Sequence, residues 1–387
     1  MYTYKLMNKD DVLLIFKESS FPGEYDILEV NEPLKSTLPP IFTSEIDSRR
    51  LRTFIENRVV SINRTHIDIV LGKINTKTKF EQVIYCKGLS LSDTYWILPE
   101  YEYFTWKEVN LFTNKFDKAL GWMAFTGVPS DVSRHLRTPE LTTVGVLPKY
   151  WDRDKSKVFL VKGGTRHYAN AGLEPISEVC ASVIAEVLGL NAIRYDYAIV
   201  ENRPVSICKL FTSEDIGLLT AQEFRFLAGI DNISVSLKDY MEIMQNFGLE
   251  TKELKRMIFF DDLVRNSDRH LNNWGFSVCN NTRRLLGLAP IWDTGESLIA
   301  KTMPDDFPLM AASEEEFASF NTLYRLLRPI YYREQEKSDL YKLETLIKSS
   351  RLMTLFKERN IPDSENDKLN LICEVLIARI NMIRDDI

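Results

Sequence analysis

The sequence predicts an α+β protein in which a small mixed α/β domain precedes a small β-rich lobe and a larger helical lobe. Three observations support this fold class. Short strand-like runs flank one helical pattern in the first part of the chain, strand and turn patterns follow, and nearly everything after residue 215 has helical periodicity. The expected domains are therefore residues 1–115, 116–212 and 213–387.

The predicted N-terminal domain combines strand-like runs with one helix. The runs are residues 12–16 and 82–85, which are short and rich in residues that favour strands. Between them, "SEIDSRRLRTFIENR" has helical spacing, with Thr43 or Ser44 as a suitable N-cap. Its apolar residues fall close to one helical face: Ile46, Leu51, Phe54 and Ile55.

The same helix carries three arginines, Arg49, Arg50 and Arg52. Together they could hold a phosphate, but charged residues on a helix most often form a solvated face. We therefore expect a charged surface here rather than a binding site.

The β-rich lobe is predicted from a strand, a helix and a hairpin, in that order. The strand "KVFLVK" ends at Lys162, directly before two glycines. The helix "EPISEVCASVIAEVLGL" has valines at helical spacing and Gly189 as its stop. In "YDYAIVENRPVSICKLF", two apolar runs surround the turn residues Asn202 and Arg203, which indicates a hairpin.

The helical lobe is interrupted by the polar stretch "NSDRHLNNWGF" and by the loop "LAPIWDTGESLIAKTMPDDFP". Its last part contains "FNTLYRLLRPIYY" and "LNLICEVLIARINMI", which predict amphipathic helices. A β-rich lobe next to a helical lobe is expected to leave a cleft, where ligands commonly bind.

The composition is that of an ordinary globular protein of 387 residues, with 44% hydrophobic and 27% charged residues. A net charge of -6 disfavours a nonspecific binder of nucleic acid or of anionic lipid. The five cysteines are odd in number and lack C-x-x-C spacing, which argues against a disulfide framework or a structural zinc site. No signal peptide or membrane span is visible, so a cytoplasmic protein is expected.

The polar stretch "NSDRHLNNWGF" follows the apolar helix "ELKRMIFFDDLVRN", so a packed helix is expected to support its exposed side chains. Asp268 and Asn273 are five residues apart, and Asp293 follows twenty residues later. Asn273 and Asp293 offer oxygen ligands of the kind that Mg²⁺ prefers. Asp268 is then left to receive a proton. The layout is typical of phosphoryl transfer. Asn266 is expected to end the helix.

Phosphoryl transfer from a nucleotide needs further parts, and they occur in the expected order. Lys162 ends a strand and is suited to pair nucleotide phosphates, and Glu178 in the following helix is suited to hold that lysine. The segment Lys209–Phe211 follows the predicted hairpin, where a backbone hinge would contact adenine.

At these motifs the sequence resembles the HipA-like family, bacterial serine/threonine protein kinases known as toxins of persistence modules. "NSDRHLNNWGF" and "APIWDTGESL" are similar to the catalytic segments of that family. "TTVGVLPK", residues 142–149, is similar to its glycine-containing phosphate loop. The resemblance covers roughly residues 135–385. It implies a bilobal, protein-kinase-like fold, preceded here by a domain of unknown role.

The resemblance implies roles for individual residues. Asp268 would be the catalytic base, and Asn273 and Asp293 would be the magnesium ligands. His270 would brace the catalytic loop, and Arg269 would hold a neighbouring carboxylate. The residues expected to contact or support ATP are Lys162, Thr142, Thr143, Val144, Gly145, Lys149, Glu178, Lys209, Phe211 and His270.

The phosphate loop has two notable features. Thr142, with Thr143 next to it, occupies the position that family members autophosphorylate, so either threonine is a candidate for modification. The loop has one glycine, Gly145, and a proline, Pro148, which makes it stiffer than a loop with several glycines.

The leading hypothesis is a kinase that uses ATP and Mg²⁺ to phosphorylate a protein hydroxyl, with a DNA-binding antitoxin as a possible partner. A lipid or small-molecule kinase is one alternative, although the long basic loops that anionic lipid heads require are missing. A noncatalytic, kinase-shaped interaction module is another. The joint presence of Lys162, Asp268, Asn273 and Asp293 argues against the last alternative.

Overall fold

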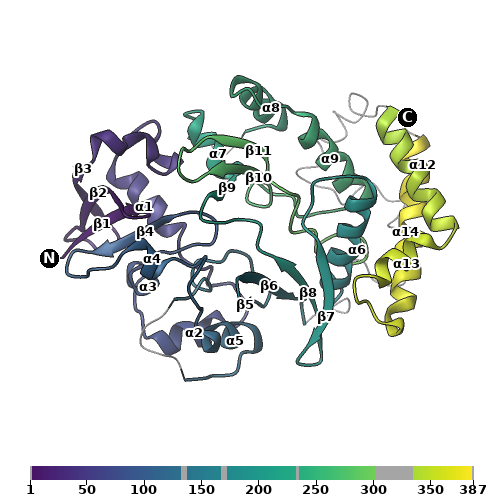
Figure 1. Cartoon of the computed structure of the whole chain (residues 1–387), viewed down its shortest axis with the longest axis horizontal. Coiled ribbons are helices and arrows are strands. Elements are labelled where there is room, and N and C mark those ends of the chain that lie inside the picture. Colours follow the sequence, from purple (N-terminus) through teal and green to yellow (C-terminus); the bar gives the residue numbers. More distant parts are fainter. Residues whose placement is uncertain (1, 132–136, 167–171, 232–234, 301–333, 386–387) are drawn as a thin grey trace. The chain divides into compact units, whose positions relative to one another are not determined.

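The computed structural model describes residues 2–131, 137–166, 172–231, 235–300 and 334–385, and it has a mixed α+β fold with antiparallel strand pairs (Figure 1). The predicted α+β class is confirmed. The chain divides into two compact units. The first consists of Met1–Val161, Leu210–Asn232 and Gly275–Leu286, and the second of Lys162–Lys209, Ile233–Trp274 and Gly287–Ile387.

A four-stranded antiparallel sheet begins the first unit. Its strands lie in the order β3-β2-β1-β4, with β1 at Thr3–Asn8, β2 at Asp11–Glu18, β3 at Tyr25–Val30 and β4 at Tyr95–Pro99. A two-residue turn at Lys9 and Asp10 joins β1 to β2, and Lys9 has a φ of 51°. Leu14 and Phe16 of β2 are buried in the core of this sheet. The strand predicted at residues 12–16 is therefore confirmed.

The helix α1 lies beside this sheet and shares its hydrophobic core. The helical elements of this region are η1 (Glu32–Thr37), η2 (Pro40–Phe42), α1 (Ser48–Glu56), α2 (Ile67–Ile74) and α3 (Lys79–Tyr85). The N-cap of α1 is Asp47, whose carboxylate accepts a hydrogen bond from the backbone N–H of Arg50 at 2.7 Å. The N-cap predicted at Thr43 or Ser44 is therefore wrong.

Residues 82–85, predicted to be a strand, form the end of α3. Thr78 caps this helix, because its hydroxyl accepts a hydrogen bond from the backbone N–H of Glu81 at 3.1 Å. The strand prediction is wrong because a four-residue apolar run does not distinguish a strand from a helix. The threonine three residues before Glu81 was the better local signal.

The three arginines of α1 do not form one solvated face. Arg50 is buried, pairs with Asp231 at 2.6 Å, and also donates to the backbone carbonyl of Ile41 at 2.7 Å. Arg49 and Arg52 are exposed. The expected solvated face is therefore correct for two arginines and wrong for Arg50, which is committed to internal contacts.

The rest of the first unit consists of short helices and strands. These are α4 (Trp106–Val109), α5 (Lys118–Thr126), β5 (Lys149–Asp154), most of β6 (Lys157–Gly163), β9 (Ile216–Thr220), α7 (Ala221–Leu227), β10 (Gly275–Cys279) and the start of β11 (Leu285–Leu288). β9 and β10 pair antiparallel within a sheet of order β11-β10-β9. β5 and β6 are neighbouring strands, so the loop before β5 is anchored to a sheet.

In its described residues, the second unit is mainly helical and contains a hairpin. Its helices are α6 (Glu174–Val187), α8 (Leu237–Asn246), α9 (Lys252–Val264), α12 (Glu334–Lys348), α13 (Arg351–Lys357), the short η4 (Asp363–Glu365) and α14 (Asn366–Asp385). The hairpin consists of β7 (Tyr195–Val200) and β8 (Arg203–Lys209), which pair antiparallel. Its turn residues are Glu201 and Asn202, with φ of 49° and 57°. The predicted hairpin is confirmed, with its turn one residue earlier than expected.

The helix α6 is buried along most of its length and contacts both strands of the hairpin, β7 and β8 (Figure 1). α13 contacts α6, and α14 contacts α9, α12 and α13. The predicted helix "EPISEVCASVIAEVLGL" corresponds to α6, and "LNLICEVLIARINMI" lies in α14. The helix predicted at residues 320–332 lies outside the described residues.

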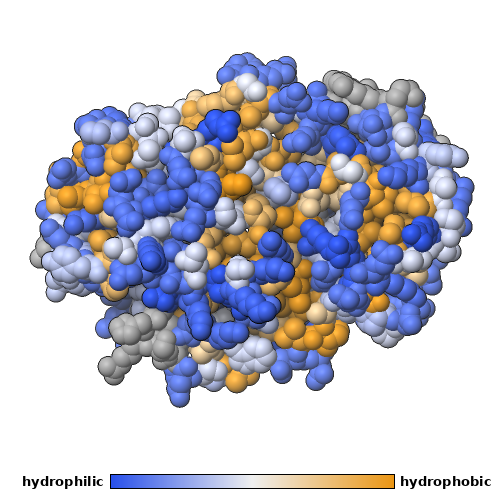
Figure 2. Space-filling model, viewed as in Figure 1, coloured by the Kyte–Doolittle hydropathy of each residue, from blue (hydrophilic) through white to orange (hydrophobic). Residues whose placement is uncertain are grey.

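Figure 2 shows a face on which hydrophilic and hydrophobic residues are interspersed. Among the described helices, none combines the length and the apolar composition needed to cross a membrane.

Candidate active site

The polar stretch after α9 begins with a backbone conformation that ends the helix. Arg265 has a φ of 55°, in the left-handed region, and α9 stops at Val264. Asn266 comes next and is buried, and its amide donates to the carboxylate of Asp261 at 2.8 Å. Its side-chain oxygen accepts from the backbone N–H of Asp268 at 3.3 Å. Asn266 therefore lies two residues beyond Val264 and links α9 to Asp268, and the residue that ends the helix is Arg265 rather than the expected Asn266.

Arg269 is a buried residue that joins three segments of the site. Its Nε and Nη2 donate to the two carboxylate oxygens of Asp261, each at 2.9 Å. Its Nη1 donates to the backbone carbonyls of Asn273 at 2.5 Å and Trp292 at 2.6 Å. The expectation that Arg269 holds a carboxylate is confirmed. The fork of the guanidinium suits this task because it offers several donors in one rigid plane.

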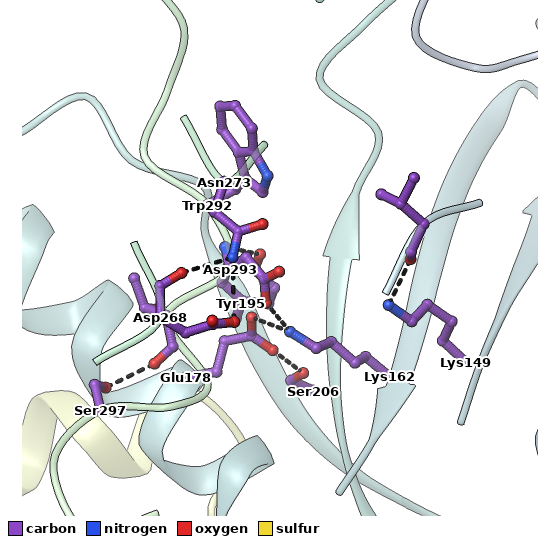
Figure 3. Close-up of polar contacts among 12 residues, drawn as sticks. Lys149, Lys162, Glu178, Tyr195, Ser206, Asp268, Asn273, Trp292, Asp293 and Ser297 are labelled. Atoms are coloured by element: carbon purple, nitrogen blue, oxygen red, sulfur yellow. Dashed lines mark hydrogen bonds and ion pairs between the residues drawn. The ribbon is translucent and has the colours of Figure 1, made fainter. Parts of the chain in front are cut away.

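Asp268 and Asn273 lie in direct contact within this loop (Figure 3). The side-chain amide of Asn273 donates to the backbone carbonyl of Asp268 at 2.8 Å and to its Oδ2 at 3.3 Å. Asn273 is buried, whereas 44% of the Asp268 side chain is exposed. Asp268 therefore presents a solvent-accessible carboxylate on a loop that buried polar contacts hold in place.

His270 lies on the exposed side of the same loop, with 54% of its side chain accessible. Its Nδ1 accepts a hydrogen bond from the backbone N–H of Asn272 at 3.2 Å. Its Nε2 lies 3.9 Å from Oδ2 of Asp268. These contacts fit a brace for the loop. A contact of His270 with ATP stays a prediction.

The ammonium of Lys162, near the end of β6, lies between two carboxylates (Figure 3). It contacts Oε1 of Glu178 on α6 at 3.0 Å and Oδ1 of Asp293. Burial by itself lowers the pKa of Lys162, but the negative charges of Asp293 and Glu178 together raise it above its usual value. The lysine is therefore a fixed positive charge throughout the neutral pH range.

Two hydroxyl groups not identified from the sequence support these carboxylates (Figure 3). Ser206 on β8 donates to Oε2 of Glu178 at 2.5 Å, and both side chains are buried. The phenol oxygen of Tyr195 on β7 accepts from the backbone N–H of Asp293 at 3.3 Å. Burial raises the pKa of Tyr195 well above its usual value, so the phenol stays neutral.

Asp293 adopts a backbone conformation that is uncommon for a residue other than glycine. Its φ is 54°, in the left-handed region, which aspartate tolerates better than most residues. Such a conformation persists only where the surroundings hold it, and it often marks a functional site. Here the contacts come from Tyr195 on one side and Lys162 on the other.

Asn273 and Asp293 were expected to bind magnesium, and their donor atoms fit that ion. The amide nitrogen of Asn273 is directed to Asp268, which leaves its oxygen as the atom available for a metal. Mg²⁺ prefers oxygen ligands and is often held by one or two protein groups together with substrate phosphates. Among the described residues there is no cluster of three or more histidine, cysteine, aspartate or glutamate side chains.

The predicted phosphate loop, residues 142–149, belongs to the first unit. The hydroxyls of Thr142 and Thr143 donate to the carbonyls of Leu89 and Pro139, respectively, both at 2.7 Å. The ammonium of Lys149 donates to the carbonyl of Val144 at 2.9 Å (Figure 3).

Gly145 lies at the tip of this loop with a φ of 91°. A side chain is rarely compatible with that conformation, and a Cβ there would collide with the end of the Lys149 side chain. Val144, Gly145 and Val146 are exposed. The tip is accessible, whereas the threonines and Lys149 are held by internal contacts.

The predicted hinge, Lys209–Phe211, begins at the last residue of β8. The backbone N–H of Leu210 donates to the carbonyl of Val158 at 2.9 Å. The division between the two compact units falls between Lys209 and Leu210. Adenine contact at this segment stays a prediction.

The comparisons with known proteins indicate the family and the fold of the chain. The family model of the HipA-like C-terminal domain matches residues 140–343, which is more than half of the chain and includes every predicted site residue. No curated protein matches the chain.

The solved structures that are similar to this chain include two bacterial proteins. HipA of Shewanella oneidensis MR-1, solved with HipB and its operator DNA, has 13% identity and a TM-score of 0.56, with 99% of each chain covered. The Helicobacter pylori proinflammatory kinase CtkA has 18% identity and a TM-score of 0.46, with 62% of this chain and 90% of that chain covered. The similarity to HipA shows a shared fold.

Proposed function

The chain belongs to the family of the HipA-like C-terminal domain, and from this premise we propose that it is a protein kinase that transfers the γ-phosphate of ATP to a serine or threonine hydroxyl. The observation that carries the proposal is the buried ammonium of Lys162 between the carboxylates of Glu178 and Asp293. A lysine that is paired with a helix acid and lies next to a metal-binding aspartate is the arrangement that a kinase requires.

We assign the role of catalytic base to Asp268. Its carboxylate is half-exposed, and the loop that carries it is fixed by Arg269, Asn266 and Asn273. A base must reach the substrate hydroxyl while its own orientation is maintained, and this combination meets both needs. In the proposed reaction, Asp268 accepts the proton of the attacking hydroxyl.

Lys162 would bind the nucleotide phosphates, with Glu178 fixing its ammonium. Asn273 and Asp293 would hold Mg²⁺, which when bound neutralises the charge that develops on the phosphates. The contact between Lys162 and Asp293 supports this assignment, because it brings the phosphate-binding and metal-binding groups to one place.

We further propose that residues 142–149 bind nucleotide phosphates, that Lys209–Phe211 contacts adenine, and that His270 lies near the nucleotide. The loop residues with this role would be Thr142, Thr143, Val144, Gly145 and Lys149. A thermal shift on adding ATP and Mg²⁺ tests the nucleotide site. Stabilisation should be larger with both than with either alone, because the metal and the nucleotide share ligands.

Autophosphorylation at Thr142 or Thr143 is a finer proposal. Both hydroxyls donate to backbone carbonyls, so phosphorylation requires those hydrogen bonds to break. The added negative charge of about 1.5 to 2 should then displace the loop and weaken ATP binding. Mass spectrometry after incubation with ATP tests this. Phosphate found only outside the loop would refute it.

The partners are a further proposal. The similar HipA structure contains HipB and operator DNA, so a DNA-binding antitoxin is the first partner to test for this chain. The product of the neighbouring reading frame should be co-expressed and co-purified. A toxin role, a cytoplasmic location and the three-domain division at residues 115 and 212 also stay proposals.

The decisive experiment is phosphate transfer from labelled ATP to a cell lysate by the wild type and by Asp268→Asn. Loss of the base should reduce transfer by about 10²–10⁴-fold while nucleotide binding persists. Transfer to lipids or small metabolites alone would favour the small-molecule kinase. Nucleotide binding without any transfer would favour the noncatalytic module, and transfer that persists in Asp268→Asn would refute the assigned base.

A further inference from the structure

Arg64 forms a fully buried ion pair with Glu140, directly before the predicted phosphate loop. Arg64 lies in the connection between α1 and α2, in the N-terminal region to which no role was assigned. Its Nη2 lies 2.6 Å from Oε2 of Glu140, and the exposed fractions of the two side chains are 0% and 1%. A buried pair of charges is tolerated only where further hydrogen bonds satisfy both partners.

Those further hydrogen bonds tie the two ends of the loop together. Arg64 Nη1 donates to the backbone carbonyl of Glu140 at 2.6 Å, and its Nη2 donates to the carbonyl of Lys149 at 2.7 Å. The other carboxylate oxygen of Glu140 accepts from the backbone N–H of Trp151 at 2.8 Å. One arginine therefore contacts the chain on both sides of residues 141–148.

The next residue, Thr65, holds the tip of the loop. Its backbone N–H and its hydroxyl both donate to the carbonyl of Val146, each at 2.9 Å. Leu89 accepts from the hydroxyl of Thr142, and the backbone N–H of Val60 donates to the carbonyl of Leu141 at 2.8 Å. The start, the tip and the end of the loop are thus each bonded to the N-terminal region of the same compact unit.

We infer that Arg64 and Thr65 are positioning residues that fix the shape of the loop 142–149 for nucleotide phosphate. The loop has a single glycine and a proline, so it has less conformational freedom than a multi-glycine loop and depends on a defined shape. The N-terminal region fixes this shape through the buried guanidinium of Arg64 and the hydrogen bonds of Thr65. The expected effect on ATP binding rests on the proposed function.

Hydrogen–deuterium exchange of the full-length protein without ATP tests the brace independently of any activity. Arg64→Lys keeps a positive charge near Glu140, but a single ammonium cannot reproduce the planar fork that reaches three acceptors. Faster exchange is expected in peptides covering residues 141–149. Thr65→Val, which removes only the hydroxyl donor, should give a smaller increase centred on the tip.

Arg50→Lys is the matched control, because Arg50 is also buried and pairs with a carboxylate at the same 2.6 Å. It should leave exchange in the loop at the wild-type rate. Unchanged loop exchange in Arg64→Lys, or an equal increase in Arg50→Lys, would overturn the inference.

Steady-state kinetics then test whether the brace serves the nucleotide. The KM for ATP should rise roughly tenfold in Arg64→Lys, with kcat changed less than about twofold, since a charge-assisted contact that orders the binding loop is lost. A general loss of folding would instead lower the amount of active protein and leave KM unchanged. A faster-exchanging loop with an unchanged KM refutes the positioning role. A wild type that binds no ATP refutes the proposed function, and the exchange data still decide whether Arg64 orders the loop.

Discussion

The guanidinium of Arg269 and the carboxylate of Asp261 form a two-point ion pair, with both N···O distances at 2.9 Å. Asp261 belongs to α9, and Arg269 belongs to the loop that follows it. Because the same arginine also bonds the carbonyls of Asn273 and Trp292, this pair connects the helix to both proposed metal-binding segments. The position of the loop therefore depends on one buried aspartate of α9.

Asp261→Asn should strongly destabilise the protein. The substitution leaves a buried guanidinium without its opposing charge, which costs on the order of 3–5 kcal/mol. Urea denaturation measures the free energy of unfolding. Asp363→Asn in the same unit is the control, because Asp363 pairs with Lys357 in solvent and its loss should leave stability close to that of the wild type. Equal stability of the two variants would contradict the importance of the Arg269–Asp261 pair.

Ser206→Ala should impair nucleotide binding through Glu178. The variant removes a buried hydrogen bond of 2.5 Å to Oε2 of Glu178, so the carboxylate that fixes Lys162 loses one of its partners. The loss of a hydrogen bond to a charged group is expected to reduce stability by about 1.5–3 kcal/mol. The KM for ATP should rise together with this loss, as measured in phosphate-transfer kinetics.

Ser182→Ala is the matched control for Ser206→Ala. Ser182 is also a buried serine, and its hydroxyl donates to the carbonyl of Val179 at 2.8 Å rather than to Glu178. The same hydroxyl accepts from the backbone N–H of Tyr195 at 3.3 Å. Its loss should lower stability without a specific change in KM for ATP. An equal rise of KM in both variants would show that the effect comes from general loosening of α6.

Tyr195→Phe should raise the magnesium concentration needed for half-maximal activity. Only the phenol oxygen is lost, and with it the acceptor for the backbone N–H of Asp293, whose φ of 54° requires support. A neutral hydrogen bond of this kind is worth about 1 kcal/mol, so a change of about fivefold is expected. The measurement is a magnesium titration of phosphate transfer at saturating ATP.

Tyr197→Phe provides the comparison on the same strand. Its phenol contacts Glu365 at 3.2 Å and no proposed metal ligand. The magnesium requirement of this variant should match that of the wild type. If both phenylalanine variants shift the requirement equally, the support of Asp293 by Tyr195 is disproved.

Several parts of the fold and of the candidate site could be predicted because their signals are local. Val12–Phe16 is a continuous apolar run long enough to be recognised as a strand, and the hairpin has turn residues between two apolar runs. The pairing of Lys162 with Glu178 was expected from the order of the motifs, and that ion pair is present. The ion pair of Lys162 with Asp293 was not expected, because Asp293 was assigned to the metal alone.

The supporting residues could not be predicted, because each depends on a partner far away in the sequence. Arg64 and Glu140 are 76 positions apart, and Ser206 and Glu178 are 28 apart. A lone arginine or serine carries no sign of its partner, since the same residue types are most often exposed. Of the supporting residues, Asp261 was the easiest to recognise from the sequence, because it is an acid within the largely apolar run "MIFFDDLV".

The short helix α3 shows where local signals compete. The run of residues 82–85 matches a strand pattern, yet the capping threonine Thr78 and the packing of Phe80 and Val83 in the core favour a helix. Tertiary packing decides such short segments more often than propensity does.

The buried cysteines predict how stability changes in alkali. Burial raises the pKa of Cys86 to about 11 and that of Cys208 to about 12. An unfolded thiol loses its proton near pH 8.5, so above that pH the unfolded state binds fewer protons than the native state. Stability is then fully present below pH 8.5 and falls as pH rises toward the folded pKa, by about 1.4 kcal/mol per pH unit for each thiol.

The contribution of one thiol can be isolated with Cys86→Ala. The variant loses packing at all pH values, so the informative quantity is the slope of the unfolding free energy between pH 9 and 10, measured by urea denaturation. That slope should be less steep than in the wild type by about 1.4 kcal/mol per pH unit, because one buried proton is no longer retained. Cys279→Ala is the control, since hydrogen bonds from Thr282 and the neighbouring backbone lower the pKa of that thiol. A thiol with a lowered pKa does not make the unfolding free energy fall as pH rises. An unchanged slope in Cys86→Ala would mean that Cys86 ionises in the native protein as readily as in the unfolded chain.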